Sequence, residues 1–309
     1  MNLDKYLPPQ QAKSPAATVP AGAEKQVEKP IDLSALKGLN LNGGLRVGLL
    51  VAHGVKVEKL QIGVHAAGGK LDLNPISASL YQGTLLGSAS ANANGNLFSV
   101  KQQLAGVSIG PLMRDAAGKD FLEGRGNVQM DVQTSGATVA ALKKALNGTA
   151  SLNLKDGALK GINLAESFRK AKAALGAKGA TEQAANKTDK TDFSEMSASF
   201  VIRNGVAHNE DLSAKSPFLR LSGAGDINLG ADTMDYLAKA AIVNSAGGQG
   251  GKELDSIKGL TVPVRLTGPF DSLKYSIDYA AMVSESAKQQ VQQKVQEQLG
   301  DKLKGLFKR

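Results

Sequence analysis

The sequence predicts a mostly β fold of many strands, with peripheral helices and a helix at the C-terminus. Apolar residues alternate with polar ones through most of residues 32–279, which is typical of half-buried strands. The chain of 309 residues contains 35 glycines, which suit turns and bulges but weaken helices. Aromatic residues make up only 4%, with no tryptophan, so bulky core filling is scarce. Together these observations favour strands and turns over a helical bundle.

The chain divides into three predicted parts. Residues 1–30 are a short remnant followed by a linker, because five of the ten prolines fall between residues 8 and 30 among Ala, Glu and Lys. Residues 31–280 form the β-rich domain. A polar Ala/Lys/Thr-rich stretch at about 176–191 within it is expected to be a mobile loop. Residues 281–309 form a helix without a breaker until Gly300.

Strands are expected where the alternation is clear, and turns where Gly or Pro interrupts it. Asn94-Gly95 predicts a hairpin turn. Pro263 lacks an amide proton for a sheet hydrogen bond, which predicts an edge strand around it. The clearest alternating runs are Leu60–Val64, Leu71–Leu73, Leu97–Val107, Gly126–Thr134, Leu152–Leu154 and Leu219–Leu229.

Short helices are expected at 110–117, with Pro111 in the first turn, at 138–146 and at 163–175. The C-terminal helix carries an apolar stripe, and residues 291–309 hold five basic side chains against two acidic ones. A basic amphipathic helix can bind a membrane surface; a solvated or coiled-coil helix is the alternative. The candidate membrane-surface residues are Val291, Lys294, Val295, Leu299, Lys302, Leu303, Lys304, Phe307, Lys308 and Arg309.

The sequence offers little for catalysis or cofactors. There is no cysteine, and His53, His65 and His208 stand alone, without Asp or Glu at metal-ligand spacing. The glycine-rich stretch at 247–252 is followed by Glu253, where a phosphate loop needs Ser or Thr. The formal charge of +9 suits an anionic partner. Aromatic residues are dispersed, however, so no stacking platform for nucleic acid is predicted. We expect no enzyme activity, no cofactor, no metal and no nucleic-acid partner.

A long sheet with one apolar face must cover that face. Three arrangements remain open at this point. Helices cover the face, a second sheet packs on it as in a sandwich, or the sheet curls into a groove whose apolar inside stays open to acyl chains. Few aromatics and many small residues would leave such a groove unfilled.

A series of short motifs, in order along most of the chain to about residue 280, resembles the C-terminal region of AsmA-family proteins. The motifs are Leu3-Asp4-Lys5-Tyr6-Leu7-Pro8-Pro9, residues 33–39 (LSALKGL), 80–83 (LYQG), 109–112 (IGPL), 121–126 (FLEGRG), 142–148 (LKKALNG), 156–164 (DGALKGINL) and 262–269 (VPVRLTGP).

The resemblance implies a bacterial envelope protein with a large periplasmic β-rich body, held in the inner membrane by one N-terminal helix. Relatives of the family resemble bridge-like lipid transfer proteins, whose long taco-shaped sheet carries phospholipid acyl chains along an apolar groove. They are linked to outer-membrane assembly. No anchoring helix is seen at the start of this sequence, so we expect either a fragment or a late start.

The combined prediction is a long curved antiparallel sheet forming an open groove, with a role in binding phospholipid and supporting its transport to, or assembly of, the outer membrane. The alternative is an assembly factor that affects outer-membrane protein insertion without carrying lipid. Expected partners are phospholipid, a membrane surface and other envelope proteins. The candidate groove residues, which would otherwise form a packed core, are Leu60, Ile62, Val64, Leu71, Leu73, Val128, Met130, Val132, Leu152, Leu154, Leu219, Leu221 and Ile227.

Overall fold

The computed structural model describes residues 2, 28–52, 54–161, 163–164, 180–184, 186–217, 219–243 and 261–278. Most of the described residues lie in strands. The strands are β1 (Leu41–Ala52), β2 (Val55–Ala67), β3 (Lys70–Leu80), β4 (Gly83–Asn92), β5 (Leu97–Ser108), β6 (Leu122–Ser135), β7 (Asn147–Gly161), β8 (Ala180–Ala184), β9 (Asn186–Arg203), β10 (Val206–Lys215), β11 (Leu219–Asn228), β12 (Thr233–Ile242), β13 (Thr261–Pro269) and β14 (Lys274–Asp278). The helices are the 3-10 helix η2 (Ser34–Gly38), α1 (Ile109–Ala117) and α2 (Val139–Lys144).

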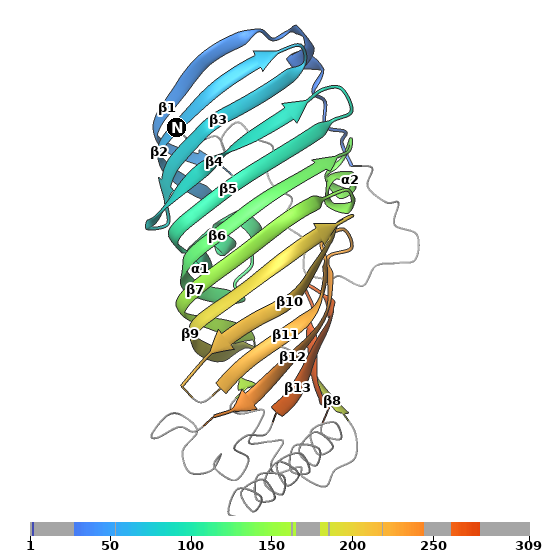
Figure 1. Cartoon of the computed structure of the whole chain (residues 1–309). Helices are drawn as coiled ribbons and strands as arrows, with labels where there is room; N and C mark the ends of the chain where they lie inside the picture. Colours follow the sequence, from blue (N-terminus) through green and yellow to red (C-terminus); the bar gives the residue numbers. More distant parts are fainter. Residues whose placement is uncertain are drawn as a thin grey trace, which may run out of the picture.

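All fourteen strands belong to one antiparallel sheet (Figure 1). Strands that follow one another in the chain are neighbours in the sheet, except β8, which lies at the far edge beside β14. The edge strands β1 and β8 do not pair with each other, so the sheet is open. The predicted β-rich antiparallel fold is confirmed. Tight turns make the meander possible, as at Asn94-Gly95, where Gly95 has φ +89° and Asn96 φ +46° between β4 and β5.

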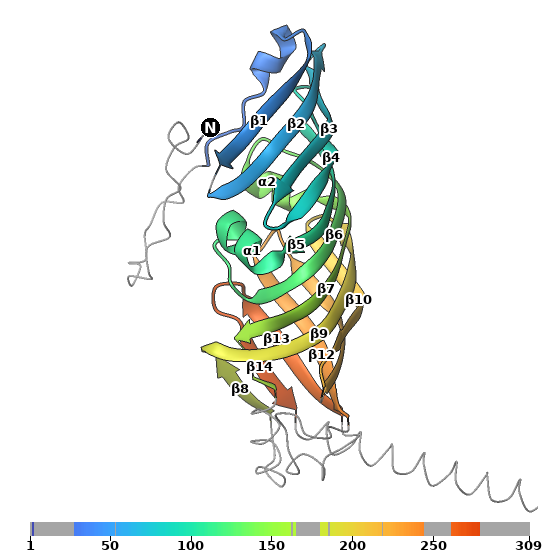
Figure 2. The same cartoon turned by 90° about the vertical axis from the view of Figure 1, so that its left-hand side faces the viewer.

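The sheet is strongly curved, with a convex outer face and a concave inner face (Figures 1 and 2). Register shifts interrupt the pairing of β2 with β3, β5 with β6 and β10 with β11, and such bulges increase the right-handed twist. Lys119, in the connection before β6, forms an ion pair with Asp271 in the β13–β14 turn. Six strands separate β6 from β14 in the sheet order, so the last strands curl back towards the middle of the sheet.

Two of the predicted helices are confirmed. α1 ends at Gly118, whose left-handed backbone (φ +62°) lets its N–H reach the carbonyl of Arg114. α2 begins after Thr138, whose hydroxyl accepts a hydrogen bond from the N–H of Ala141 at 3.2 Å. In Figure 2 both helices lie on the inner side of the sheet, α1 between the strand labels β2 and β7 and α2 above it.

The loop expected at about 176–191 is wrong where the structure describes it. Residues 180–184 form β8, and β9 begins at Asn186. Residues 186–191 extend the pairing with β7, as in the partnership of Thr191 with Leu159. These polar residues lack the apolar alternation by which a strand is predicted from sequence. Backbone pairing with neighbouring strands, and not side-chain burial alone, holds them in the sheet.

Pro263 is not in an edge strand, contrary to prediction, because β13 lies between β12 and β14. Its register partner is Lys239 of β12, whereas pairing with β14 begins one residue later, at Val264. The proline therefore occupies the part of β13 that β14 does not pair with, so this stretch has a neighbour on one side only.

Three expectations fall wholly or mostly outside the described residues. The C-terminal helix of residues 281–309, with all its candidate membrane-surface residues, is one, and the linker up to residue 27 is another. Of the helix expected at 163–175, only Asn163 and Leu164 are described. The domain boundaries near residues 30 and 280 accordingly stay predictions.

Candidate functional site

The inner face of the sheet is a continuous apolar surface. In an antiparallel pair, directly opposed residues put their side chains on the same face. Val128 opposes Leu104 on one side and Leu152 on the other, and Leu152 opposes Ala198 in turn. The register places all thirteen predicted groove residues on this one face: Leu60, Ile62, Val64, Leu71, Leu73, Val128, Met130, Val132, Leu152, Leu154, Leu219, Leu221 and Ile227. Their role in binding a ligand stays a prediction.

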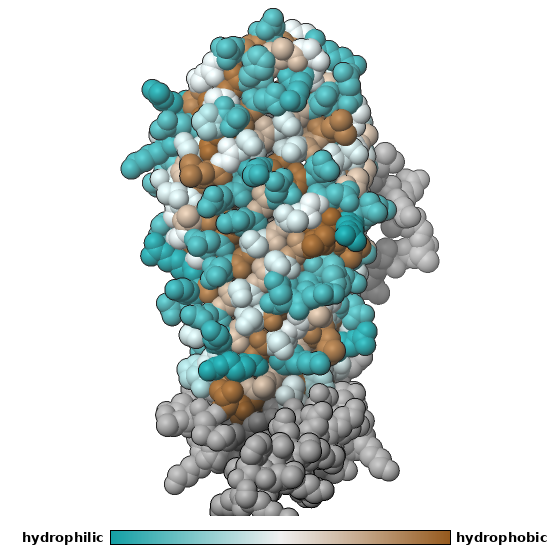
Figure 3. Space-filling view, viewed as in Figure 1, coloured by the Kyte–Doolittle hydropathy of each residue, from teal (hydrophilic) through white to brown (hydrophobic). Residues whose placement is uncertain are grey.

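The two faces differ sharply in polarity. In the paired rows from β2 to β7, the inner-face side chains are apolar apart from Gln102 and Thr134. The charged side chains of those rows lie on the outer face, where Lys101 and Asp131 form an ion pair at 3.1 Å. Figure 3 shows the outer face, covered mainly by hydrophilic residues with scattered hydrophobic ones. An apolar concave face with a polar convex back is suited to an apolar ligand.

Sequence reasoning missed part of the inner face. Strand β1 contributes Leu45, opposite Ile62, and strands β4 and β5 contribute Leu85 and Leu104, which oppose each other. In β5, Val100 and Leu104 share one face and the polar residues Lys101 and Gln103 lie on the other, a pattern that the sequence shows. For β4, the small residues Gly87, Ala89 and Ala91 hide the pattern, because their hydropathy differs little from that of the serines beside them.

The inner face is filled at one end of the sheet. Side chains from β7, β9 and β11–β14 meet in one cluster, and Leu154, Ala240 and Val262 in it are fully buried. Contact among residues from non-neighbouring strands follows from the curl that brings β13 and β14 back towards β6. This end is a packed core, and the candidates Leu154, Leu219 and Leu221 belong to it.

Towards β1 the inner face remains partly exposed. Ile62, Leu73, Val128 and Leu152 are only half-buried, and Leu45 on the edge strand keeps 49% of its surface exposed. One small buried cluster there contains Leu60, Ile76 and Ala78. Val132 is buried in another, and the packed core itself extends to Leu80, Val107 and Leu122 on β3, β5 and β6. The apolar surface available to a ligand therefore extends over β1–β7, which we call the open groove.

Helix α1 lies against one rim of the open groove. Leu112 and Met113 pack on the apolar cluster, and Asp115 accepts a hydrogen bond of 2.6 Å from the hydroxyl of Tyr81 at the β3–β4 turn. Burial and this carboxylate raise the pKa of Tyr81 to about 12, so the phenol stays protonated and keeps donating. The contact fixes α1 to the sheet.

Helix α2 is tied to the opposite ends of the strands. The Thr134 hydroxyl donates to the carbonyl of Leu142 at 2.6 Å, which satisfies one of the two polar side chains on the inner face of β2–β7. Lys143 also forms an ion pair of 2.8 Å with Asp232 in the β11–β12 turn. Helix α1 thus covers part of the inner face beside β5 and β6, whereas α2 lies at the ends of the strands.

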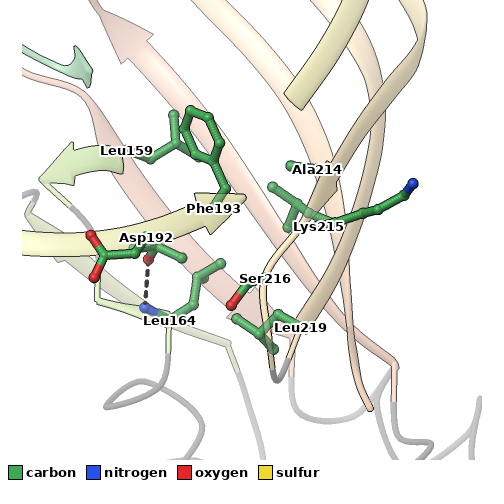
Figure 4. A pocket seen from close by; sticks show the side chains of 10 residues that line it. Leu159, Leu164, Asp192, Phe193, Ala214, Lys215, Ser216 and Leu219 are labelled. Atoms are coloured by element: carbon green, nitrogen blue, oxygen red, sulfur yellow. Dashed lines mark hydrogen bonds between the residues drawn. The ribbon is translucent and has the colours of Figure 1, made fainter. Parts of the chain in front are cut away.

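A small cavity lies in the filled end, between β9, β10 and Leu164 (Figure 4). Apolar side chains, including Phe193 and Leu219, form most of its wall, and it contains about 250 Å³ of empty space, part of it open to solvent. The Ser216 hydroxyl, buried there, has no hydrogen-bond partner. This volume is below the range of about 300–1,000 Å³ usual for ligand pockets, so the cavity is a packing gap rather than a second binding site.

A buried polar pair stabilises the filled end. Tyr236 donates its hydroxyl hydrogen to Oδ1 of Asn209, which is almost fully buried. The Asn209 amide in turn donates to the carbonyl of Ser199 at 2.7 Å and to Asp211 at 2.6 Å. Burial, with a further contribution from Asp211, raises the pKa of Tyr236. The network is satisfied within the protein and has no group left for a ligand.

The histidines that the structure describes do not form a metal site. His208 lies on the outer face, with Nδ1 at 2.7 Å from Asp226 and Nε2 at 3.0 Å from Glu210. Hydrogen bonds to Glu210 and Asp226 raise the pKa of His208. Among the described residues, no group of three or more His, Asp or Glu could hold a metal ion. His53 lies outside those residues.

No helix in the described part of the chain has the length and hydropathy needed to cross a bilayer. No solved structure matches the chain. Over 211 residues the chain is 24% identical to protein AsmA of Escherichia coli (strain K12), a match that covers 68% of this chain but about one third (34%) of that relative. The model of the AsmA family matches residues 2–212, which include the strands of the open groove. The chain belongs to the AsmA family.

Proposed function

We propose that this chain is a non-enzymatic envelope protein that holds phospholipid acyl chains in the open groove and supports lipid transport to, or assembly of, the outer membrane. Membership of the AsmA family supports an envelope role linked to outer-membrane assembly. The periplasmic location and the lipid ligand belong to the proposal.

The observation that carries the proposal is the partly exposed apolar inner face of β1–β7. A soluble protein normally removes contiguous apolar surface from water, at roughly 25 cal/mol per Å². Here Leu45, Ile62, Val128 and Leu152 remain partly exposed in one continuous surface. Acyl chains would cover it without any hydrogen bond, and lipid headgroups would stay at the rim in water.

The test compares two glutamates placed on adjacent residues of β6. Met130 lies on the inner face, opposite Gln102 and Ala150, whereas Gln129 is exposed on the outer face, opposite Gln103 and Ser151. A carboxylate cannot be covered by acyl chains without losing its hydration, which costs several kcal/mol. We expect Met130→Glu to lose co-purifying phospholipid in native mass spectrometry, and Gln129→Glu to retain it.

Far-UV circular dichroism of both variants should match the parent chain, since Met130 is half-buried and a glutamate there can reach water. A parent chain that carries no phospholipid, or a Met130→Glu variant that carries as much as the parent, would refute the proposal. The alternative, an assembly factor without lipid, is favoured by the packed core of β9–β14. It predicts a lipid-free chain in the same experiment.

A further inference from the structure

Gln102 is an unusual residue on the inner face of the open groove. It lies on β5 between Val100 and Leu104, which share its face, and it opposes Gly87 on β4 and Met130 on β6. Val100 packs with one apolar cluster and Leu104 with another, so Gln102 lies at the seam between the two. The amide therefore interrupts a surface that is otherwise suited to hydrocarbon.

The side-chain amide of Gln102 is not used by the fold. Its Oε1 is shielded from solvent and has no hydrogen-bond partner. Leaving a buried polar atom unpaired costs roughly 1–3 kcal/mol. Thr134, the other polar side chain on this face, donates to a backbone carbonyl instead. The Ser216 hydroxyl is unpaired as well, but it lies in a cavity too small for a ligand, whereas Gln102 lies on the face proposed to hold lipid. A ligand on this face can supply the partner that the fold does not.

The strand β4 places no side chain beside Gln102. Gly87 has no side chain, and a Cβ built there would lie 2.1 Å from the carbonyl oxygen of Lys101, so a larger residue cannot take its place without moving the backbone. Ile76, next in the same row, is separated from Gln102 by this glycine. Gln102 as a whole is only partly buried, so a ligand lying along the groove can approach its amide from the side of β4.

We propose that the Gln102 amide hydrogen-bonds the ester linkage of a bound acyl lipid and thereby sets how the lipid is positioned in the open groove. The inference rests on the proposed function. Acyl chains offer no hydrogen-bonding atoms, whereas the ester that joins each chain to glycerol carries a carbonyl oxygen. Rotation about the last side-chain bond of Gln102 exchanges its oxygen for its NH₂ group, which donates to that carbonyl.

The experiment measures the preference for ester over ether linkages. The purified chain is titrated with dipalmitoyl phosphatidylglycerol and with its dihexadecyl ether analogue, which lacks the carbonyl oxygens. The variants are Gln102→Met, of similar length without polar hydrogen-bonding groups, and the outer-face control Gln103→Met, opposite Leu86 and Gln129. We expect the parent and Gln103→Met to bind the ester lipid about three- to tenfold more tightly, the range that one hydrogen bond supplies.

Gln102→Met is expected to bind the two lipids equally. Its melting temperature without lipid should equal or exceed that of the parent, because the substitution removes an unpaired buried atom. Equal binding of both lipids by the parent, a preference retained in Gln102→Met, or a marked fall in its melting temperature would overturn the inference while leaving the proposed function intact. Failure of the parent to bind either lipid would instead refute the proposed function, and the inference with it.

Discussion

The division of the inner face into a filled end and an open groove predicts that one substitution has two different costs on the same strand. Leu152 and Leu154 are two residues apart on β7 and face the same way. Leu154 is fully buried in the filled end, whereas Leu152 is half-buried at its border. Leu→Ala at the two sites makes the same chemical change on the same strand and face. The difference between the two losses of stability therefore measures the effect of burial.

The expected magnitudes follow from what each side chain loses. At about 0.8 kcal/mol for each buried carbon group, the three carbons removed from Leu154 account for about 2.4 kcal/mol. The cavity left in a core that cannot collapse raises the total to about 3–5 kcal/mol. At Leu152 the side chain already contacts solvent and water can enter the gap. There we expect a loss of about 1–2 kcal/mol.

Urea unfolding of both variants, followed by circular dichroism, measures the two free energies, provided that the slope of the transition is unchanged. Losses that agree within about 1 kcal/mol would refute the division. The filled end would then be no better packed than the open groove, and the available apolar surface would not stop near β7.

Three further predictions concern the sheet itself. Gly126→Ala should lower the free energy of unfolding by at least about 2 kcal/mol, because the new Cβ would lie 2.0 Å from the Asn153 carbonyl oxygen. The control is Gly43→Ala, whose Cβ would have no atom within 4 Å. Equal urea midpoints for the two variants would contradict the prediction. Tyr236→Phe should cost about 1–3 kcal/mol by leaving Oδ1 of buried Asn209 without its donor. An unchanged urea midpoint would show that the hydroxyl contributes nothing. Because the folded pKa of His208 is raised, its stabilising effect is complete below the unfolded pKa of about 6.5 and is lost as the pH rises through the folded value. The melting temperature of the parent, measured from about pH 6 to about pH 8, should then fall relative to that of His208→Gln; parallel profiles would exclude the coupling.

The local patterns of the sequence were sufficient for the elements with strong periodicity. Val128, Met130 and Val132 alternate with polar residues and lie on one face of β6, and Pro111 and Thr138 mark the starts of α1 and α2. Patterns failed where side chains carry little hydropathic contrast. The β4 residues Gly87 and Ala89 are examples, and β8, whose place in the sheet is beside β14, is another.

The sequence by itself determined that the sheet has one apolar face, because a period of two fixes which side chains lie together whatever the strand order. Only the tertiary structure decided how much of that face stays available. The Lys119–Asp271 ion pair and the shared burial of Leu154 and Val262 depend on a curl accumulated over many strands, which no local window records. The same curl buries Leu154 fully and leaves Gln102 partly exposed. Only the strand register shows that Gln102 lies between a glycine and a methionine on the inner face.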